Sequence, residues 1–244
     1  IEEITTGLKL DFTAVGMNDD SWSYGDYKGK FEGFNWNATS GWVNNRLRIN
    51  AGASFAIDYA PLAGTPTDKG RTLEFEFRTT NVNDDNAVIC DLRENGVGLL
   101  ITATKISLTS EAGVVVENEF KANEDVRLSI VINKTSGSTR KGLSLIYANG
   151  CVSRCENWGA GDSYESNAQI TFSGSLGAEV ELKAIRIYEA ALSDDQILNN
   201  YILYRDTVAE MLESDVQAAY ERYLDARVEV YGEEKAAKRP QTLM

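Results

Sequence analysis

The chain alternates between apolar and polar residues over most of its length, a period of two that is typical of half-buried β-strands. Residues 73–78 (LEFEFR) show the alternation most clearly, and turn residues separate such segments at short intervals. Asn149 and Gly150 favour a tight hairpin because both tolerate positive φ. The pattern predicts an all-β fold, either a two-sheet sandwich or a barrel. The predicted strands are 8–12, 47–50, 55–59, 73–78, 87–92, 98–103, 105–109, 114–120, 126–133, 143–148, 151–152, 169–173 and 180–188.

The apolar pattern changes to a helical spacing at residue 193. Ser193 and Gln196 have the spacing of a capping box, in which Ser193 accepts the amide N–H of Gln196. We expect a short helix at 193–205, then a second helix, or a continuation of the first, over 208–230 that ends at Gly232. The apolar seam of the second helix consists of Leu212, Val216, Ala219, Tyr223, Ala226 and Val230.

This seam needs a partner, because charged residues flank it and an isolated amphipathic helix gains little in water. Three partners are open: the sandwich of the same chain, the same helix in a second copy, or another domain. The chain starts at Ile1 without a signal peptide and ends in a basic tail, 235–239, so we expect a fragment or processed piece of a larger protein. These features favour self-association or interdomain packing through helix 208–230.

The net charge of −13 repels phosphate backbones and acidic lipid headgroups, so we expect neither nucleic acid nor a membrane surface as a partner. No apolar run approaches the roughly 18 residues that would predict membrane insertion. The sequence has no His, which excludes Ser/His/Asp triads and His-ligated zinc. We expect Cys90, Cys151 and Cys155 to be reduced, with a Cys151–Cys155 disulfide as the alternative.

Residues 182–201 carry a recognisable motif: a strand of the form apolar-Arg-apolar-Tyr (185–188), followed by Ala-Leu-Ser-Asp-Asp-Gln-Ile (191–197). This segment resembles the closing part of laminin-G-like jelly rolls of the concanavalin A-like lectin/glucanase superfamily. With its continuation into a further helix, it is most similar to jelly rolls in gut-bacterial adhesins and tailed-phage tail or fibre proteins. The resemblance implies a two-sheet antiparallel jelly-roll sandwich over 1–206, followed by a helical extension and tail at 207–244.

The superfamily includes glycoside hydrolases as well as lectins, adhesion modules and virion proteins, so fold alone does not assign function. Its retaining hydrolases carry a strand of the type Glu-x-Asp-x-Glu, which holds two carboxylates on one face. Here the matching positions are Glu74, Glu76 and Arg78, and an arginine lowers a neighbouring carboxyl pKa, which is wrong for a general acid. We therefore expect no catalytic residue, and place these carboxylates on a solvated outer face, paired with Lys or Arg across strands.

Three of the four tryptophans lie in a Gly-, Asn- and Ser-rich stretch, 18–45. Sugar binding needs a flat apolar ring beside groups that hydrogen-bond to hydroxyls, and this stretch offers both. Burial of the rings at the end of the sandwich is the alternative interpretation. The candidate ligand-binding residues are Trp22, Tyr24, Asn35, Trp36, Asn37, Trp42 and Asn44.

Two acidic turns, at 18–20 and 81–86, contain the oxygen ligands that calcium prefers. Asn83, Asp84 and Asp85 are the candidate ligands, although Asp and Asn are also ordinary turn residues. The sequence requires no cofactor. If the protein binds one, calcium is the candidate.

The sequence thus predicts a non-catalytic recognition or structural module. We expect it to bind a glycan or a partner protein as part of a larger protein on the extracellular surface or in a virion. A glycoside hydrolase using carboxylates, and a purely architectural virion domain without sugar binding, are the alternatives.

Overall fold

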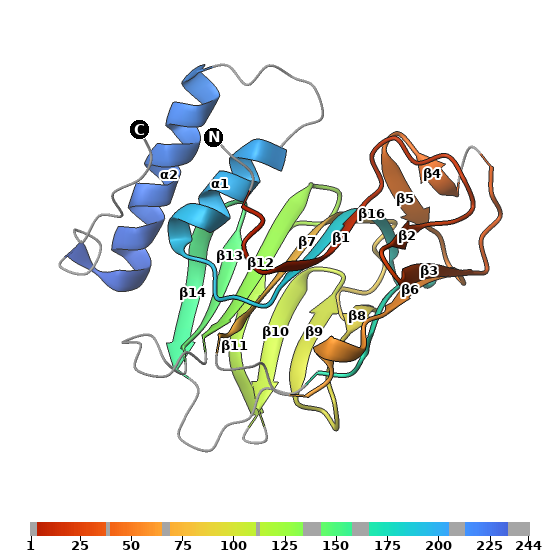
Figure 1. Cartoon of the computed structure of the whole chain (residues 1–244), viewed down its shortest axis with the longest axis horizontal. Coiled ribbons are helices and arrows are strands. Elements are labelled where there is room, and N and C mark those ends of the chain that lie inside the picture. The colour runs from red at the N-terminus through yellow and green to blue at the C-terminus, as the bar shows by residue number, and fades with distance from the viewer. Residues whose placement is uncertain are drawn as a thin grey trace.

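The computed structural model describes residues 4–37, 40–64, 69–110, 113–133, 143–157, 166–204 and 213–233. They form two antiparallel sheets packed face to face, with two helices outside them (Figure 1). This confirms the predicted sandwich with a C-terminal helix. The elements are β1 (Leu8–Thr13), β2 (Ser23–Tyr24), β3 (Tyr27–Glu32), β4 (Gly41–Val43), β5 (Arg46–Ile49), β6 (Ser54–Asp58), η1 (Ala60–Leu62), β7 (Arg71–Thr80), β8 (Val88–Asp91), β9 (Gly98–Thr102), β10 (Lys105–Ser110), β11 (Gly113–Glu119), β12 (Val126–Asn133), β13 (Leu143–Ala148), β14 (Cys151–Asn157), β15 (Gln169–Ser173), β16 (Glu179–Tyr188), α1 (Asp194–Tyr204) and α2 (Glu213–Tyr231).

The first sheet has the strand order β14-β13-β12-β7-β16-β5-β4. On the same edge of β16, β5 pairs with residues 180–182 and β1 pairs with residues 184–188. The second sheet has the order β11-β10-β9-β8-β15-β6-β3-β2. Asn149 and Gly150 have φ angles of 50° and 80°, so the predicted hairpin between β13 and β14 is confirmed. Other pairings are non-local, as between β6 and β15, and they bring together residues that lie far apart in the sequence.

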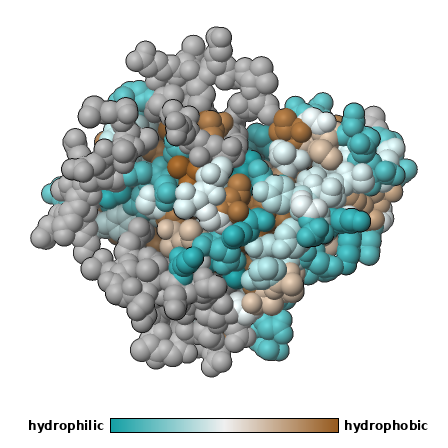
Figure 2. Space-filling model, in the orientation of Figure 1, coloured by the Kyte–Doolittle hydropathy of each residue, from teal (hydrophilic) through white to brown (hydrophobic). Residues whose placement is uncertain are grey.

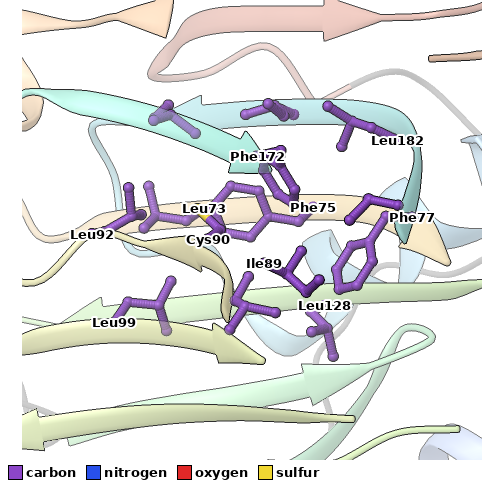
Figure 3. Packing of buried hydrophobic residues seen from close by; sticks show 14 of the residues in the cluster. Leu73, Phe75, Phe77, Ile89, Cys90, Leu92, Leu99, Leu128, Phe172 and Leu182 are labelled. Atoms are coloured by element: carbon purple, nitrogen blue, oxygen red, sulfur yellow. The ribbon is translucent and has the colours of Figure 1, made fainter. Parts of the chain in front are cut away.

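The core lies between the sheets and is filled from alternate positions of their strands. On β7, Leu73, Phe75 and Phe77 point into it, as the alternation predicts (Figure 3). The Phe75 and Phe77 rings lie 5.7 and 5.9 Å from the ring of Phe172 on β15. The two sheets therefore meet through aromatic side chains.

The opposite face of β7 is polar but not solvated, which corrects our expectation for Glu74 and Glu76. Their exposed fractions are only 1% and 8%. Glu74 accepts hydrogen bonds from Ser129 on β12 and from Asn200 on α1, and Glu76 pairs with Lys183 on β16 at 2.7 Å. These carboxylates can be buried because each has a hydrogen-bonding or charged partner.

Glu181 on β16 is buried in the same way, between Arg48 on β5 and Arg78 on β7. The two arginines donate to its two carboxylate oxygens at 2.8 and 2.6 Å. The predicted cross-strand pairing is confirmed here, although we expected the carboxylate itself to be solvated.

Cys90 and Cys151 are free thiols, as we expected, so the alternative Cys151–Cys155 disulfide is not formed. Burial raises the pKa of both thiols, which keeps them protonated and unreactive near neutral pH. The side chain of Cys155 lies outside the described residues.

Helix α1 begins with the predicted capping box. The amide of Gln196 donates to Ser193 Oγ, and the amide of Ser193 donates to Gln196 Oε1. Helix α1 lies over the outer face of the first sheet, and α2 packs beside it and against β14 (Figure 1). Among the described residues, no helix is both long and apolar enough to cross a lipid bilayer.

The described part of the α2 seam is covered by its own chain. Ala219 and Tyr223 are buried in one apolar cluster with Leu198 and Ile202 of α1. Ala226 and Val230 pack at the edge of a second cluster, which has buried residues from β12, β13, β14, β16 and α1. The structure therefore favours docking within the chain over the assembly that we expected for this seam. The side chains of Leu212 and Val216, and the whole tail 235–239, lie outside the described residues.

Candidate functional site

An aromatic cluster closes one end of the sandwich, around the hairpins β2-β3 and β4-β5. Phe31 on β3 lies at its centre, with ring centroids 4.9 Å from Phe55, 5.5 Å from Phe34, 5.2 Å from Trp36 and 5.7 Å from Trp42. Such packing fixes the orientation of each ring, so the exposed members are held in place.

Trp22 and Trp42 belong to the inner part of this cluster. Trp22 is 7% exposed and packs edge-on against Phe12, with centroids 5.3 Å apart, so its ring faces offer no surface to a ligand. Trp42 is half-buried, and its indole Nε1–H donates to the carbonyl of Asp19. For Trp22 the alternative interpretation, burial at the end of the sandwich, describes the structure, whereas Trp42 is only partly buried.

Trp36 and Tyr24 are the exposed candidates, with 39% and 37% of their surface accessible. Trp36 stacks on Phe34 at 5.1 Å with an interplanar angle of 19°. It also lies against the backbone of Gly41, where a Cβ atom would come within 2.5 Å of the indole ring. Because Gly41 has a φ of 78° as well, this position is restricted to glycine.

Trp36 lies between two polar residues in the sequence. Both of them, Asn35 and Asn37, are exposed. The Ser40 hydroxyl donates to the carbonyl of Asn35, and Asn37 and Ser40 exchange two backbone hydrogen bonds of 3.3 Å. The loop therefore carries an exposed, anchored indole with an exposed asparagine on each side of it in the sequence.

Asn44 is also exposed, but its position has a backbone explanation. Asn44 and Asn45 have φ angles of 52° and 60° and form the turn between β4 and β5. Asparagine is favoured at such positions because its side chain tolerates the left-handed region.

The candidate calcium ligands lie in a hydrogen-bonded turn. The amides of Asn83 and Asp84 donate to the carbonyl of Gly177, and Asp84 Oδ1 accepts the amide of Asn86 at 2.9 Å. The Asn83 side-chain amide donates to backbone carbonyls. Within the part of the chain that the structure describes, no three Asp, Glu, Cys or His side chains come together as a metal site.

A polar pocket that we did not predict lies on the outer face of the second sheet, where β6, β15 and β8 run side by side. Its volume is about 290 Å³. Alternation along β6 and β15 indicates that Asp58, Gln169 and Thr171 face outward, but the pairing of these strands cannot be inferred from the sequence. The lining residues are Asp58, Ala60, Asp91, Asn167, Ala168, Gln169 and Thr171.

The polar side chains of the pocket are linked to one another. Gln169 Nε2 donates to Asp58 Oδ1 at 2.7 Å, and the Thr171 hydroxyl donates to Gln169 Oε1 at 3.0 Å. Lys30 pairs with the second oxygen of Asp58. Its hydrogen bond, followed by that of Gln169, lowers the pKa of Asp58.

Asp91 forms the other wall. Arg93 donates to it from Nε and Nη2 at 2.8 and 2.6 Å, and this side-chain hydrogen bonding lowers the pKa of Asp91. Asn167 donates to the backbone carbonyls of Asp91 and Arg93. The pocket therefore contains two ionised carboxylates, each with its own cation.

No protein-family model and no curated protein matches this sequence. Solved structures with the same fold include the receptor-binding domain of botulinum neurotoxin D, with a TM-score of 0.60 and 14% identity over 81% of this chain and 53% of that chain. The serotype D ligand-binding domain in complex with N-acetylneuraminic acid matches at TM-score 0.56 and 14% identity, over 72% and 46% of the two chains. The binding domain of neurotoxin DC in complex with SialylT matches at 0.52 and 15%, over 73% and 46%.

The chain spans about half the length of these solved structures. At such identities the similarity establishes the fold: a β-sandwich of the kind found in those receptor-binding domains.

Proposed function

We propose that the chain is a non-catalytic carbohydrate-recognition module of a larger protein on an extracellular surface or in a virion. The observation that carries the proposal is Trp36, an exposed indole anchored on Phe34 and flanked by Asn35 and Asn37. An indole supplies a flat apolar surface for the C–H groups of a sugar ring, and the amides supply donors and acceptors for its hydroxyls.

The rest of the aromatic cluster supports this surface. Because the Trp36 ring is stacked on Phe34 and confined by Gly41, little rotamer entropy is lost when it binds a ligand. Tyr24 supplies a second exposed ring on β2. The structural neighbours add support of another kind, because two of them were solved with N-acetylneuraminic acid and with SialylT.

The carboxylates support a non-catalytic role. A general acid needs a raised pKa and access to substrate. Glu74 and Glu76 lie beneath the outer surface, where they are paired. Asp58 and Asp91 line a pocket, but their cation partners lower their pKa values, which is the wrong direction for proton donation.

The finer parts of the proposal concern family, context and calcium. We propose a laminin-G-like jelly roll of the adhesin or tailed-phage kind, from the motif at 185–197. A calcium ion at Asn83, Asp84 and Asp85 remains part of the proposal, and thermal melting with calcium and with a chelator tests it. An unchanged melting temperature would argue against that ion.

A glycan array probed with the purified chain tests the function. We expect binding to at least one glycan, at least tenfold weaker in Trp36→Ala and largely retained in Trp36→Phe, which keeps an aromatic face. Leu176→Ala is the matched control, because Leu176 is an exposed apolar residue outside the cluster. Circular dichroism verifies that each variant is folded.

Two outcomes would contradict the proposal. An array without any bound glycan would favour a purely architectural domain. Binding that is equal in Trp36→Ala and in the unchanged chain would remove Trp36 from the site.

A further inference from the structure

We propose that the pocket between β6, β15 and β8 is a second binding site, which takes one neutral monosaccharide unit. In it, Asp58, Asp91 and Gln169 accept hydrogen bonds from the sugar hydroxyls. The inference extends the proposed carbohydrate recognition to a site away from Trp36, on different residues, so either can fail without the other.

Hydrogen-bond accounting shows what the pocket offers to a ligand. Both side-chain N–H groups of Asn167 already donate to backbone carbonyls. Gln169 keeps one free N–H and one free lone pair on Oε1, after its bonds with Asp58 and Thr171. The carboxylates also keep lone pairs, because each oxygen of Asp58 accepts one hydrogen bond and has two acceptor sites. Acceptors therefore outnumber donors, and the ligand must supply the hydrogens.

The charge of the pocket selects among hydrogen donors. Lys30 neutralises Asp58 and Arg93 neutralises Asp91, so an ammonium group finds no unbalanced carboxylate. An anion finds Lys30 and Arg93 already paired with these carboxylates, and the net charge of −13 repels it at long range. A neutral polyhydroxyl compound matches both conditions, because hydroxyl groups bring hydrogens without bringing charge.

The size of the pocket limits the ligand to a single ring. Its volume of about 290 Å³ lies just below the range of roughly 300–1,000 Å³ that is usual for small-molecule sites. Ala60 and Ala168 supply small apolar surface in the wall, suited to the C–H face of a pyranose. A longer glycan can enter only by one terminal or branching unit.

Titration by ¹H–¹⁵N NMR of the full chain tests this inference. The neutral probes are the methyl glycosides of glucose, galactose, mannose and N-acetylglucosamine. The anionic probe is N-acetylneuraminic acid, and the cationic probe is glucosamine. We expect at least one neutral glycoside to shift the backbone amides of 167–169 and the side-chain amide of Gln169, with a dissociation constant at least tenfold lower than that of either charged probe.

Two variants locate the binding. Ala168→Trp fills the pocket without removing any of its hydrogen-bonding side chains, and it should abolish the shifts. Gln169→Leu should weaken binding at least fivefold, because it removes an acceptor and the link to Asp58. Trp36→Ala should leave this titration unchanged.

Each contrary result overturns the inference. These results are no shift at 167–169 with any neutral glycoside, equal affinity for N-acetylneuraminic acid, or full binding in a folded Ala168→Trp variant. If glycan binding on the array depends on Trp36 while the amides of 167–169 show no chemical-shift change, this inference fails and the proposed function stands. If the pocket amides shift but Trp36→Ala leaves binding on the array unchanged, this inference stands and the role of Trp36 in the proposed function fails.

Discussion

Arg227 on α2 donates a hydrogen bond to Asp194 on α1, with Nη1 and Oδ2 2.7 Å apart and both side chains buried. Tyr147 of β13 and Tyr231 of α2 donate their hydroxyls to the other carboxylate oxygen. Asp194 is the first residue of α1, so the positive end of the helix dipole also stabilises its charge. One carboxylate thus joins both helices to the first sheet.

Figure 2 shows the face of the molecule in the orientation of Figure 1, with hydrophilic and hydrophobic residues interspersed over the described part.

We expect Asp194→Asn to destabilise the chain by about 3 kcal/mol, because the amide cannot neutralise Arg227 and presents N–H groups where an acceptor is needed. Asp195→Asn is the matched control one residue along. The side-chain oxygen of the introduced asparagine can still accept the Tyr223 hydroxyl, so this change should stay within about 1 kcal/mol. Urea unfolding at pH 7 measures both, and equal losses would show that Asp194 does not hold α2.

The carboxyl group of Asp195, next to Asp194, makes the stability of the fold depend on pH. Desolvation by burial raises the pKa of Asp195 above its usual 3.8, so the folded state binds this proton more tightly than the unfolded state. The contribution of Asp195 to stability therefore falls as pH rises through its raised pKa. Asp195→Asn should gain stability relative to the unchanged chain from about pH 4 upward, and the two should converge below pH 3.8. If the difference in unfolding free energy between Asp195→Asn and the unchanged chain narrowed as pH rises, the pKa of Asp195 would not be raised in the folded state.

Phe75→Ala should cost roughly 3–5 kcal/mol, because it leaves a cavity where the two sheets meet. Val88→Ala, a truncation at an exposed strand position, should cost under about 0.5 kcal/mol. Chemical denaturation compares the two variants. A loss below about 1 kcal/mol for Phe75→Ala would mean that the core face of β7 is misassigned.

Strands with apolar residues at every second position could be predicted from the sequence, and β12, β13 and β15 have the predicted bounds. By contrast, β3 was missed. Its inward positions are Tyr27, Gly29 and Phe31, and the glycine interrupts the apolar pattern. Glycine is needed there because a Cβ would come 2.6 Å from the Phe55 ring. Close packing between two neighbouring strands of the second sheet therefore removed the signal on which the prediction depends.

The candidate site was also predicted only in part, because some of its features depend on tertiary contacts. The sequence identified the exposed Trp36 with its two asparagines, but it could not separate Trp36 from the buried Trp22, because ring packing depends on tertiary contacts. The pocket was missed because Asp58 and Gln169 lie 111 positions apart and meet only through the register of β6 with β15. Periodicity indicates the face of a strand but not its neighbour.

We predict no reducing-sugar release from β-glucans or related polysaccharides. Glu76, the central carboxylate of the strand that resembles the hydrolase motif, is bound to Lys183 and covered. Activity that survives purification and disappears in Glu76→Gln would contradict this expectation, provided that the variant unfolds at the same temperature as the unchanged chain.

The last prediction concerns α2 itself. If its seam docks within the chain, a version ending at Asp206 should unfold at a lower temperature, because Leu198 and Ile202 lose the helix that packs on them. The exposed apolar surface should also make the shortened chain associate, whereas the full chain should be monomeric by light scattering. The contrary pattern, a full-length dimer that becomes a monomer on shortening with an unchanged melting temperature, would assign α2 to assembly. Asp194→Asn in the full chain adds an independent comparison, because it weakens the docking of α2 while leaving its seam intact.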